Sequence, residues 1–301
     1  MRLPDTAVIS VSSSLASDLN AAAATLPDYE NYEYYDEDLQ YRVFDHIRQG
    51  CKDGFGWLTE SIRTRIQLAP YCVVVKGLSF DHGYALLVAL NRAFGRLVAR
   101  HYDQTTPRAQ LIHHIQPGTD KIAGSGKLKL SEFLHVDGAE RPIPFRYLSM
   151  LCIRPDAHGG GRSALLDIDA VRKLVSESDD RSLLHFVQEQ QVPWLLGDYV
   201  GGGVAWSPIL QPDKLRWRRY TIDDALELPD VSLSDMMLRQ LDAFEALVAN
   251  AEDKIEFSMG AQELLIIDNW RCLHARTPIP NVNTDRLMLR VWVEDKSHDG
   301  P

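Results

Sequence analysis

The chain has 301 residues, of which 45% are apolar and 25% charged, and its formal net charge is -10. This composition is typical of a globular protein with a sizeable core, and the length suits one large domain. An acidic chain gains nothing from counterion release, so we expect no nucleic-acid partner. Without a cluster of Lys and Arg, a long apolar run or a signal-peptide pattern, we also expect no membrane partner and a cytoplasmic location.

The four cysteines form no Cys-x-x-Cys pair, and we interpret them as reduced, small apolar side chains. Two of them lie in apolar runs, which favours burial. A chain of this size with an ordinary core has no need of a disulfide framework. The cysteines are Cys51, Cys72, Cys152 and Cys272.

The first third of the chain is predicted to be helical around a single strand. Helices are expected at residues 13–25, 38–49 and 84–102, where apolar residues recur at helical spacing. Residues 71–78 form a β-branched run that ends at a glycine, which predicts a buried strand. The tyrosine- and acid-rich residues 29–38 are interpreted as a surface loop, with a substrate-facing arm as the alternative.

From residue 111 the pattern changes to short strands separated by turns, with helical stretches at residues 170–190 and 234–249. The nine predicted strands are residues 111–116, 132–135, 146–153, 163–168, 203–209, 216–220, 254–257, 263–267 and 287–293. Such a series favours a mainly β fold with flanking helices and a sandwich or jelly-roll core.

The domain organisation follows from this change of pattern. We expect a single domain over residues 1–301, with an N-terminal helical region at about 1–70 and a core at about 71–293. A helical insert is expected at about 170–250. The glycine run at 201–203 is interpreted as a local hinge or turn, and residues 188–203 as either a lid or an ordinary surface connection.

Chemistry is first suggested by His135 and Asp137. The period of a strand places both side chains on one face, where an imidazole and a carboxylate supply two of the three ligands of a facial metal triad. A chain with ten histidines contains about one such pair by chance. A hydrogen-bonded surface pair is therefore the alternative.

A second polar cluster follows the apolar strand at 263–267, where a tight turn leads to His274. Taken alone, His274 is also consistent with a core or turn histidine. Arg286 and Arg290 lie four residues apart in the last strand, so both point to one face, away from the alternating apolar residues. A buried guanidinium requires an anion, either a ligand carboxylate or an internal Asp or Glu.

In order and spacing these features resemble the clavaminate synthase and taurine dioxygenase (TauD/TfdA-like) superfamily of Fe(II)- and 2-oxoglutarate-dependent oxygenases. The resemblance covers about residues 71–293 and implies a double-stranded β-helix, or jelly-roll, core. It also implies that His135, Asp137 and His274 bind Fe(II). Arg286 would pair with the distal carboxylate of the cosubstrate 2-oxoglutarate, and Ser163, which follows the 159–161 glycine run, would assist it. O2 would be the second cosubstrate.

The resemblance further implies that Arg290 binds an anionic group of a small-molecule substrate. Glu140 follows Asp137 by three residues and is a candidate for an ammonium group, with a solvated carboxylate or a salt bridge to Arg141 as alternatives. We therefore predict an oxygenase of a free amino acid or small carboxylate-bearing metabolite, in specialised-metabolite biosynthesis. Hydroxylation is the expected outcome, while desaturation, cyclisation and epimerisation remain open. The presence of Asp137 argues against halogenation.

Two other classes compete with an oxygenase. Zn²⁺ also accepts two His and one carboxylate, so a metal-dependent β-helix hydrolase or isomerase could use the same site. A catalytically silent binding or scaffold protein is the third class. Arg286 and Arg290 favour the oxygenase, because metal-assisted hydrolysis does not need a carboxylate clamp.

Overall fold

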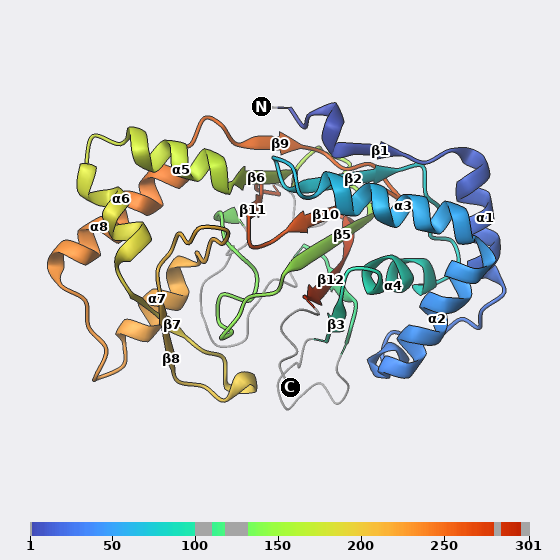
Figure 1. Ribbon diagram of the computed structural model, residues 1–301, viewed down its shortest axis with the longest axis horizontal. Coiled ribbons are helices and arrows are strands. Elements are labelled where there is room, and N and C mark those ends of the chain that lie inside the picture. The colour runs from blue at the N-terminus through green and yellow to red at the C-terminus, as the bar shows by residue number, and fades with distance from the viewer. Residues whose placement is uncertain (1, 100–109, 118–131, 280–283, 296–301) are drawn as a thin grey trace.

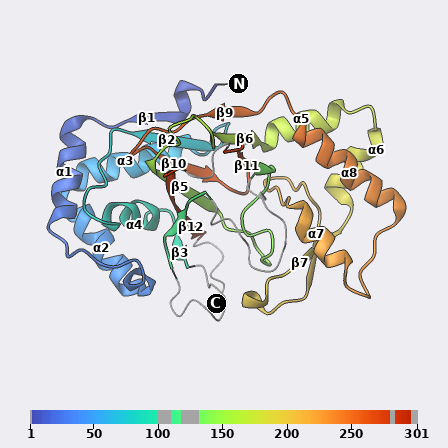
Figure 2. The same ribbon diagram turned by 180° about the vertical axis from the view of Figure 1, so that it is seen from behind.

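The computed structural model describes residues 2–99, 110–117, 132–279 and 284–295. Figures 1 and 2 show two groups of helices at opposite ends of the molecule, with the sheets between them. One group comes from the N-terminal part of the chain and the other from its middle. Within the described residues the strands form a sheet of seven, a sheet of three and a hairpin of two.

The N-terminal group packs against one face of the large sheet. It consists of α1 (Ser13–Ala24), α2 (Glu37–Gly50), α3 (Lys52–Arg65) and α4 (Ala85–Arg92), with the 3-10 turn η2 (Glu33–Tyr35). A further 3-10 turn, η1 (Asp5–Ala7), precedes the first strand and packs its Ala7 on the opposite face of the sheet. The hydroxyl of Ser12 accepts a hydrogen bond from the backbone N–H of Leu15 (3.3 Å) and so caps the first helix. Each helix turns an apolar stripe toward a common core that includes residues of the sheet.

The large sheet runs in the order β1-β2-β10-β5-β12-β3, and β4 also pairs with β12. Its strands are β1 (Val8–Ser10), β2 (Cys72–Lys76), β10 (Leu264–Asp268), β5 (Tyr147–Arg154), β12 (Leu287–Glu294), β3 (Arg96–Val98) and β4 (His113–Ile115). Along β12 the side chains alternate: Leu289 and Val291 pack on the helices, while Met288 and Trp292 join a second core on the opposite face.

That second core is shared with the small sheet, which consists of β11 (Cys272–Arg276), β6 (Ser163–Asp167) and β9 (Ile255–Phe257) in this order. Leu165 and Cys272 from the small sheet pack with Leu148, Leu265 and other residues of the large one. The two sheets therefore face each other across a shared apolar layer, and side chains that point into it from either sheet can meet.

The middle of the chain forms the second helical group around a hairpin. Its helices are α5 (Ile168–Glu177), α6 (Arg181–Glu189), α7 (Arg219–Leu226) and α8 (Asp235–Ala249), with the 3-10 turn η4 (Asp198–Val200). The hairpin pairs β7 (Val192–Leu195) with β8 (Val204–Ser207). A third apolar core fills this region, where Phe244 of α8 meets the edge of Trp217 at 4.7 Å between ring centroids.

Three predicted elements are wrong. Residues 132–135 do not form a strand, because among them only His135 pairs, through an isolated bridge to His274. Residues 84–102 do not form one long helix, because α4 ends at Arg92 and β3 then pairs with β12; residues 100–102 lie outside the described part of the chain. The backbone of Gly95 lies so close to Glu294 that no Cβ would fit there. Residues 216–220 are not a strand, because Arg218 is already the N-cap of α7.

The sequence analysis also missed several elements, namely α3, α7, β1 and β7. The tyrosine-rich segment at residues 29–38 is a connection, as predicted, but it buries Tyr34 in the core of the helical layer. Three of the four cysteines are buried, as expected, and Cys51 is partly exposed. None of the helices in the described ranges combines the length and apolarity that a bilayer span requires.

Substitution of Phe244 by Ala tests the core of the second helical group. Phe244 is fully buried, so we expect Phe244→Ala to lower the free energy of unfolding by about 3–5 kcal/mol. The control is Met236→Ala on the same helix, where the side chain is 61% exposed and the expected change is below about 0.5 kcal/mol. Urea unfolding of both variants gives the comparison, and equal effects would contradict this packing.

Candidate metal centre

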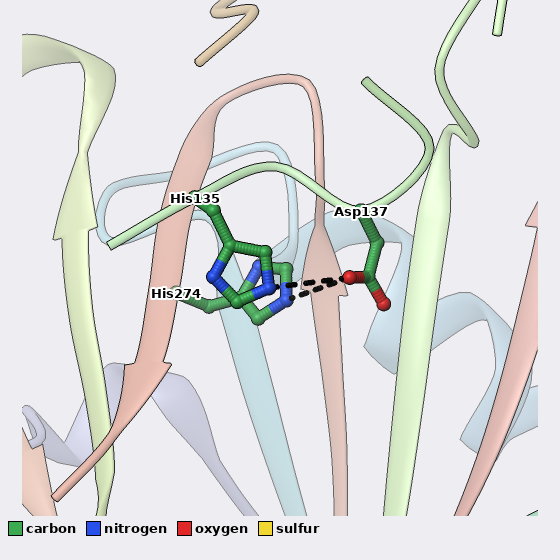
Figure 3. Close-up of side chains that lie close together, drawn as sticks. All are labelled: His135, Asp137 and His274. Atoms are coloured by element: carbon green, nitrogen blue, oxygen red, sulfur yellow. Dashed lines mark ion pairs between the residues drawn. The ribbon is translucent and has the colours of Figure 1, made fainter. Parts of the chain in front are cut away.

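His135, Asp137 and His274 meet in the layer between the two sheets. One ligand atom from each lies within 4.8 Å of the others. The Nε2 atoms of His135 and His274 lie 3.3 and 3.7 Å from Oδ1 of Asp137 (Figure 3). Asp137 is 1% exposed and the two imidazoles are nearly as well covered. The structure thus brings together the three residues that the sequence analysis selected.

The two histidines are positioned by their own backbones. The N–H of His135 donates to the carbonyl of His274 (3.0 Å), and the N–H of His274 donates back to the carbonyl of His135 (2.9 Å). Such an antiparallel pair places both side chains on one face. His274 lies opposite Leu165 of β6, which packs into the layer between the sheets. Both imidazoles therefore point into that layer.

Asn269 holds the backbone of Asp137. Its side-chain oxygen accepts from the N–H of Asp137 (3.0 Å), and its amide nitrogen donates to the carbonyls of Asp137 (2.9 Å) and Phe145 (2.7 Å). Asn269 directly follows β10, so the large sheet fixes the ligand loop. The next residue, Gly138, has φ +76°, and a Cβ there would lie 2.7 Å from the ring of Phe145. Glycine is required at this position.

The second carboxylate oxygen of Asp137 has its own donors. Oδ2 accepts from Nη1 of Arg290 (2.9 Å) and from Nε1 of Trp292 (2.8 Å). Both side chains come from β12 and face the small sheet. Arg290 therefore pairs with an internal carboxylate in this structure. Trp292 was not selected from the sequence, although its position two residues after Arg290 places it on the same strand face.

The electrostatic environment favours the protonation states that a metal needs. Burial and the neighbouring His135 lower the pKa of His274 to about 4, so its imidazole is neutral near pH 7. Burial alone would raise the pKa of Asp137, but Arg290 and the two imidazoles hold it well below its ordinary value. Nδ1 of His135 donates to the carbonyl of Phe133 (2.7 Å), which leaves the Nε2 lone pair toward Asp137.

Two imidazole nitrogens and one carboxylate oxygen are a donor set that fits a divalent transition metal. The three atoms come from one side, so a metal held by them keeps positions open toward the other. The same set also accepts Zn²⁺, so the donors alone do not select the metal.

Arg286 and Ser163 approach the same layer from opposite sheets. Arg286 is buried, and its Nη2 donates to the carbonyl of Gly161 (3.2 Å), just before β6. Ser163 begins β6 two residues before the inward-facing Leu165, so the strand period turns its side chain to the same face. A buried guanidinium and a hydroxyl thus lie on the inner side of the sheets that hold the triad.

Glu140 is paired, and its partner differs from the one considered in the sequence. Its carboxylate accepts from Nη1 of Arg218 (3.1 Å) and from the hydroxyl of Tyr199 (3.1 Å). Arg141 instead pairs with Glu294 of β12. Burial would lower the pKa of Arg218, but Glu140 raises it above its ordinary value, so the guanidinium stays charged. The alternative of a salt bridge between Glu140 and Arg141 is therefore wrong.

The segment at residues 188–203 is partly fixed in the core. Trp194 on β7 is fully buried, and its indole N–H donates to the carbonyl of Ser207 (3.3 Å) across the hairpin. The following turn carries Tyr199 to Glu140 and ends in three glycines with positive φ. The strand is thus a structural element, and only the turn lies beside the polar residues near the triad.

A comparison with known protein families finds a match to the C-terminal part of the chain. Residues 223–292 match the family described as "Taurine catabolism dioxygenase TauD, TfdA family". The match includes His274, Arg286 and Arg290. It confirms the resemblance inferred from the sequence, and no curated protein sequence matches the chain.

Solved structures share the fold over nearly the whole chain. Asparagine oxygenase in complex with Fe(II), 2S,3S-3-hydroxyasparagine and succinate has a TM-score of 0.68 at 16% identity, covering 96% of this chain and 93% of that one. The non-haem iron oxygenase OrfP in complex with Fe and alpha-ketoglutaric acid has a TM-score of 0.68 at 17% identity, with the same coverage. OrfP in complex with Fe and L-Arg has a TM-score of 0.67 at 16% identity, covering 95% and 93%. The chain has the fold of non-haem iron oxygenases.

The clamp on the Asp137 backbone can be tested with Asn269→Ala. The variant leaves buried backbone groups unpaired, each costing about 1–3 kcal/mol, and frees the ligand loop. We expect both a lower free energy of unfolding and weaker Co(II) binding, measured by urea unfolding and by titration.

The matched control is Asn250→Ala, which removes a hydrogen bond to the carbonyl of Ala246 (2.9 Å) at the end of α8. It is expected to leave Co(II) affinity unchanged. Equal Co(II) affinity in the Asn269 variant and the parent chain would show that Asn269 does not position the ligand.

Proposed function

We propose that this protein is an Fe(II)- and 2-oxoglutarate-dependent oxygenase that hydroxylates a free amino acid or a small amino-acid derivative. The observation that carries the proposal is the meeting of two imidazole nitrogens and one carboxylate oxygen between the sheets. The shared fold supports it, since similar structures hold iron with alpha-ketoglutaric acid, succinate, L-Arg or a hydroxylated asparagine. We further propose that the two facing sheets constitute a double-stranded β-helix core.

His135, Asp137 and His274 would hold the iron through one atom each. When bound, iron and 2-oxoglutarate supply the oxidising chemistry: substrate C–H, 2-oxoglutarate and O2 become C–OH, succinate and carbon dioxide. The protein contributes the geometry and the exclusion of water. The buried layer between the sheets meets both requirements, because Asp137 is almost fully enclosed.

Arg286 would bind the distal carboxylate of 2-oxoglutarate, assisted by the hydroxyl of Ser163. A guanidinium presents two parallel N–H donors that match a carboxylate, and burial strengthens the pairing because water does not compete. Arg286 is 6% exposed and reaches across to Gly161 beside β6. A dianionic cosubstrate bound there would meet a cation at its distal end and the iron at the other.

Arg290 would bind the carboxylate of the substrate, and Glu140 its ammonium group. Nη1 of Arg290 is bonded to Asp137, whereas its Nε is buried and has no hydrogen-bond partner within the described part of the chain. That edge of the guanidinium suits a second carboxylate. Glu140 follows Asp137 by three residues in the sequence, and its carboxylate, which pairs with Arg218, is the acidic group proposed to meet the substrate ammonium.

The alternative of a metal-dependent hydrolase or isomerase gains no support from the comparisons. The matched family is one of dioxygenases, and the similar structures contain iron with 2-oxoglutarate or its product succinate. A hydrolase would also have no use for Arg286, which is buried between the sheets on the side of the triad.

The proposal is tested by turnover. The purified chain is expected to convert 2-oxoglutarate to succinate in the presence of Fe(II), O2 and a suitable amino acid, measured by succinate release across the common amino acids and their derivatives. His135→Ala and His274→Ala are expected to reduce turnover to background, because each removes one metal ligand. Undiminished turnover in a metal-free preparation would sink the proposal.

The KM values for 2-oxoglutarate and for the amino acid test the proposed roles of Arg286 and Arg290. Arg286→Ala removes a charged hydrogen-bond donor, which is worth about 1.5–3 kcal/mol, so KM for 2-oxoglutarate is expected to rise about 10- to 100-fold. Arg290→Ala is expected to raise KM for the amino acid and, because Nη1 of Arg290 is bonded to Asp137, to weaken metal binding as well. Arg48→Ala, at a half-exposed arginine on α2, serves as control and should change neither value. An unchanged KM for 2-oxoglutarate in the Arg286 variant would remove it from that role.

A further inference from the structure

The two oxygens of the Asp137 carboxylate have different surroundings. Oδ1 faces the imidazoles of His135 and His274, at 3.3 and 3.7 Å from their Nε2 atoms. Oδ2 points the other way and accepts two hydrogen bonds, from Trp292 Nε1 at 2.8 Å and Arg290 Nη1 at 2.9 Å. The carboxylate is therefore divided into one oxygen toward the candidate metal and one toward β12.

We infer that Trp292, together with Arg290, is a positioning residue that restricts Asp137 to a single oxygen toward the metal. The inference rests on the metal site of the proposed function. A carboxylate oxygen has two lone-pair sites, and the indole and guanidinium N–H groups satisfy both of those on Oδ2. Asp137 would then offer a metal Oδ1 alone. A chelating carboxylate would occupy one more position, whereas a single oxygen keeps three open, as oxygen chemistry with a bidentate cosubstrate requires.

Trp292 suits this role because neighbouring rings hold its indole in place, so the indole does not move with the carboxylate of Asp137. The indole stacks on Phe145, with ring centroids 4.5 Å apart and an interplanar angle of 13°. The ring of His113 meets it edge-on at 4.3 Å. The guanidinium of Arg290 lies 4.5 Å from the Trp292 ring centroid, so the two donors also support each other. The donor direction is set by packing before any metal binds.

The same aromatic contact ties the side chain of Asp137 to its backbone. Phe145, on which Trp292 stacks, accepts a hydrogen bond from Asn269 through its carbonyl, and Asn269 clamps the Asp137 peptide. Loss of the indole N–H thus removes one donor from Oδ2 while the backbone clamp stays in place. The effect of Trp292 on the metal can therefore be separated from the folding of the loop.

The test compares two buried tryptophans. Trp292→Phe removes the indole N–H and keeps an aromatic ring on Phe145. Trp194→Phe removes a buried indole N–H that donates to Ser207 on the β7-β8 hairpin. Co(II) affinity is measured by anaerobic titration of each variant, with His274→Ala to identify binding at the triad. We expect Kd for Co(II) to rise about 10- to 100-fold in Trp292→Phe, the usual effect of losing a hydrogen bond to a metal ligand, and to stay unchanged in Trp194→Phe.

A structural role alone predicts a different result. In that case both tryptophan variants would melt at a lower temperature without metal and retain the parental Kd, which would overturn the inference. If Trp292→Phe does not fold, replacement of the Trp292 indole by a benzothiophene of the same shape deletes only the N–H group, and an unchanged Kd there would equally overturn it. The titration needs no turnover, so a failure of the oxygenase proposal would leave its result intact. A further expected effect is weaker 2-oxoglutarate binding to the Co(II)-loaded Trp292 variant.

Discussion

Two backbone hydrogen bonds between His135 and His274 are the link on which the site depends. They join a segment that belongs to no regular strand to the edge of the small sheet, next to β11. The pairing fixes the direction of both imidazoles before any ligand is present. Without it, two histidines that are far apart in the sequence would have no reason to share a face, and Asp137 would have no defined place relative to them.

The large sheet supplies the opposing half of the site. Asn269 at the end of β10 holds the Asp137 peptide, and β12 holds the carboxylate through Arg290 and Trp292. The histidines thus belong to one sheet, while the carboxylate is oriented by the other. The geometry of the cluster depends on how the sheets pack, and the apolar layer between them keeps it free of bulk water.

The sequence predicted which side chains share a strand face better than it predicted which residues those side chains contact. Residues 132–135 do not form the predicted strand: His135 pairs only through an isolated bridge to His274, and Asp137 lies in a turn, so the strand period does not explain why these side chains meet. The period of a strand did give the inward face of β12 correctly, because alternation is a local property. It did not identify what each side chain contacts. Arg290 meets Asp137, and Glu140 meets Arg218 from 78 residues away. Such pairs are chosen by tertiary packing.

The errors in secondary structure have a similar origin. Residues 84–102 carry apolar residues that fit a helix, yet Gly95 brings the backbone against β12 and the chain continues as a strand. Short apolar runs satisfy either period, so tertiary pairing decides between them. Trp292 was missed because an aromatic residue in an apolar strand reads as core, and it is core by packing as well as a donor to Asp137.

The double use of β12 has a consequence for sequence divergence. One face of the strand packs on the N-terminal helices through Leu289 and Val291, and the other carries Arg290 and Trp292. Substitutions in the helical layer are therefore tolerated only when they leave the distance between β12 and the small sheet unchanged. A change in the packing of the helical core would therefore reach the carboxylate of Asp137 through β12.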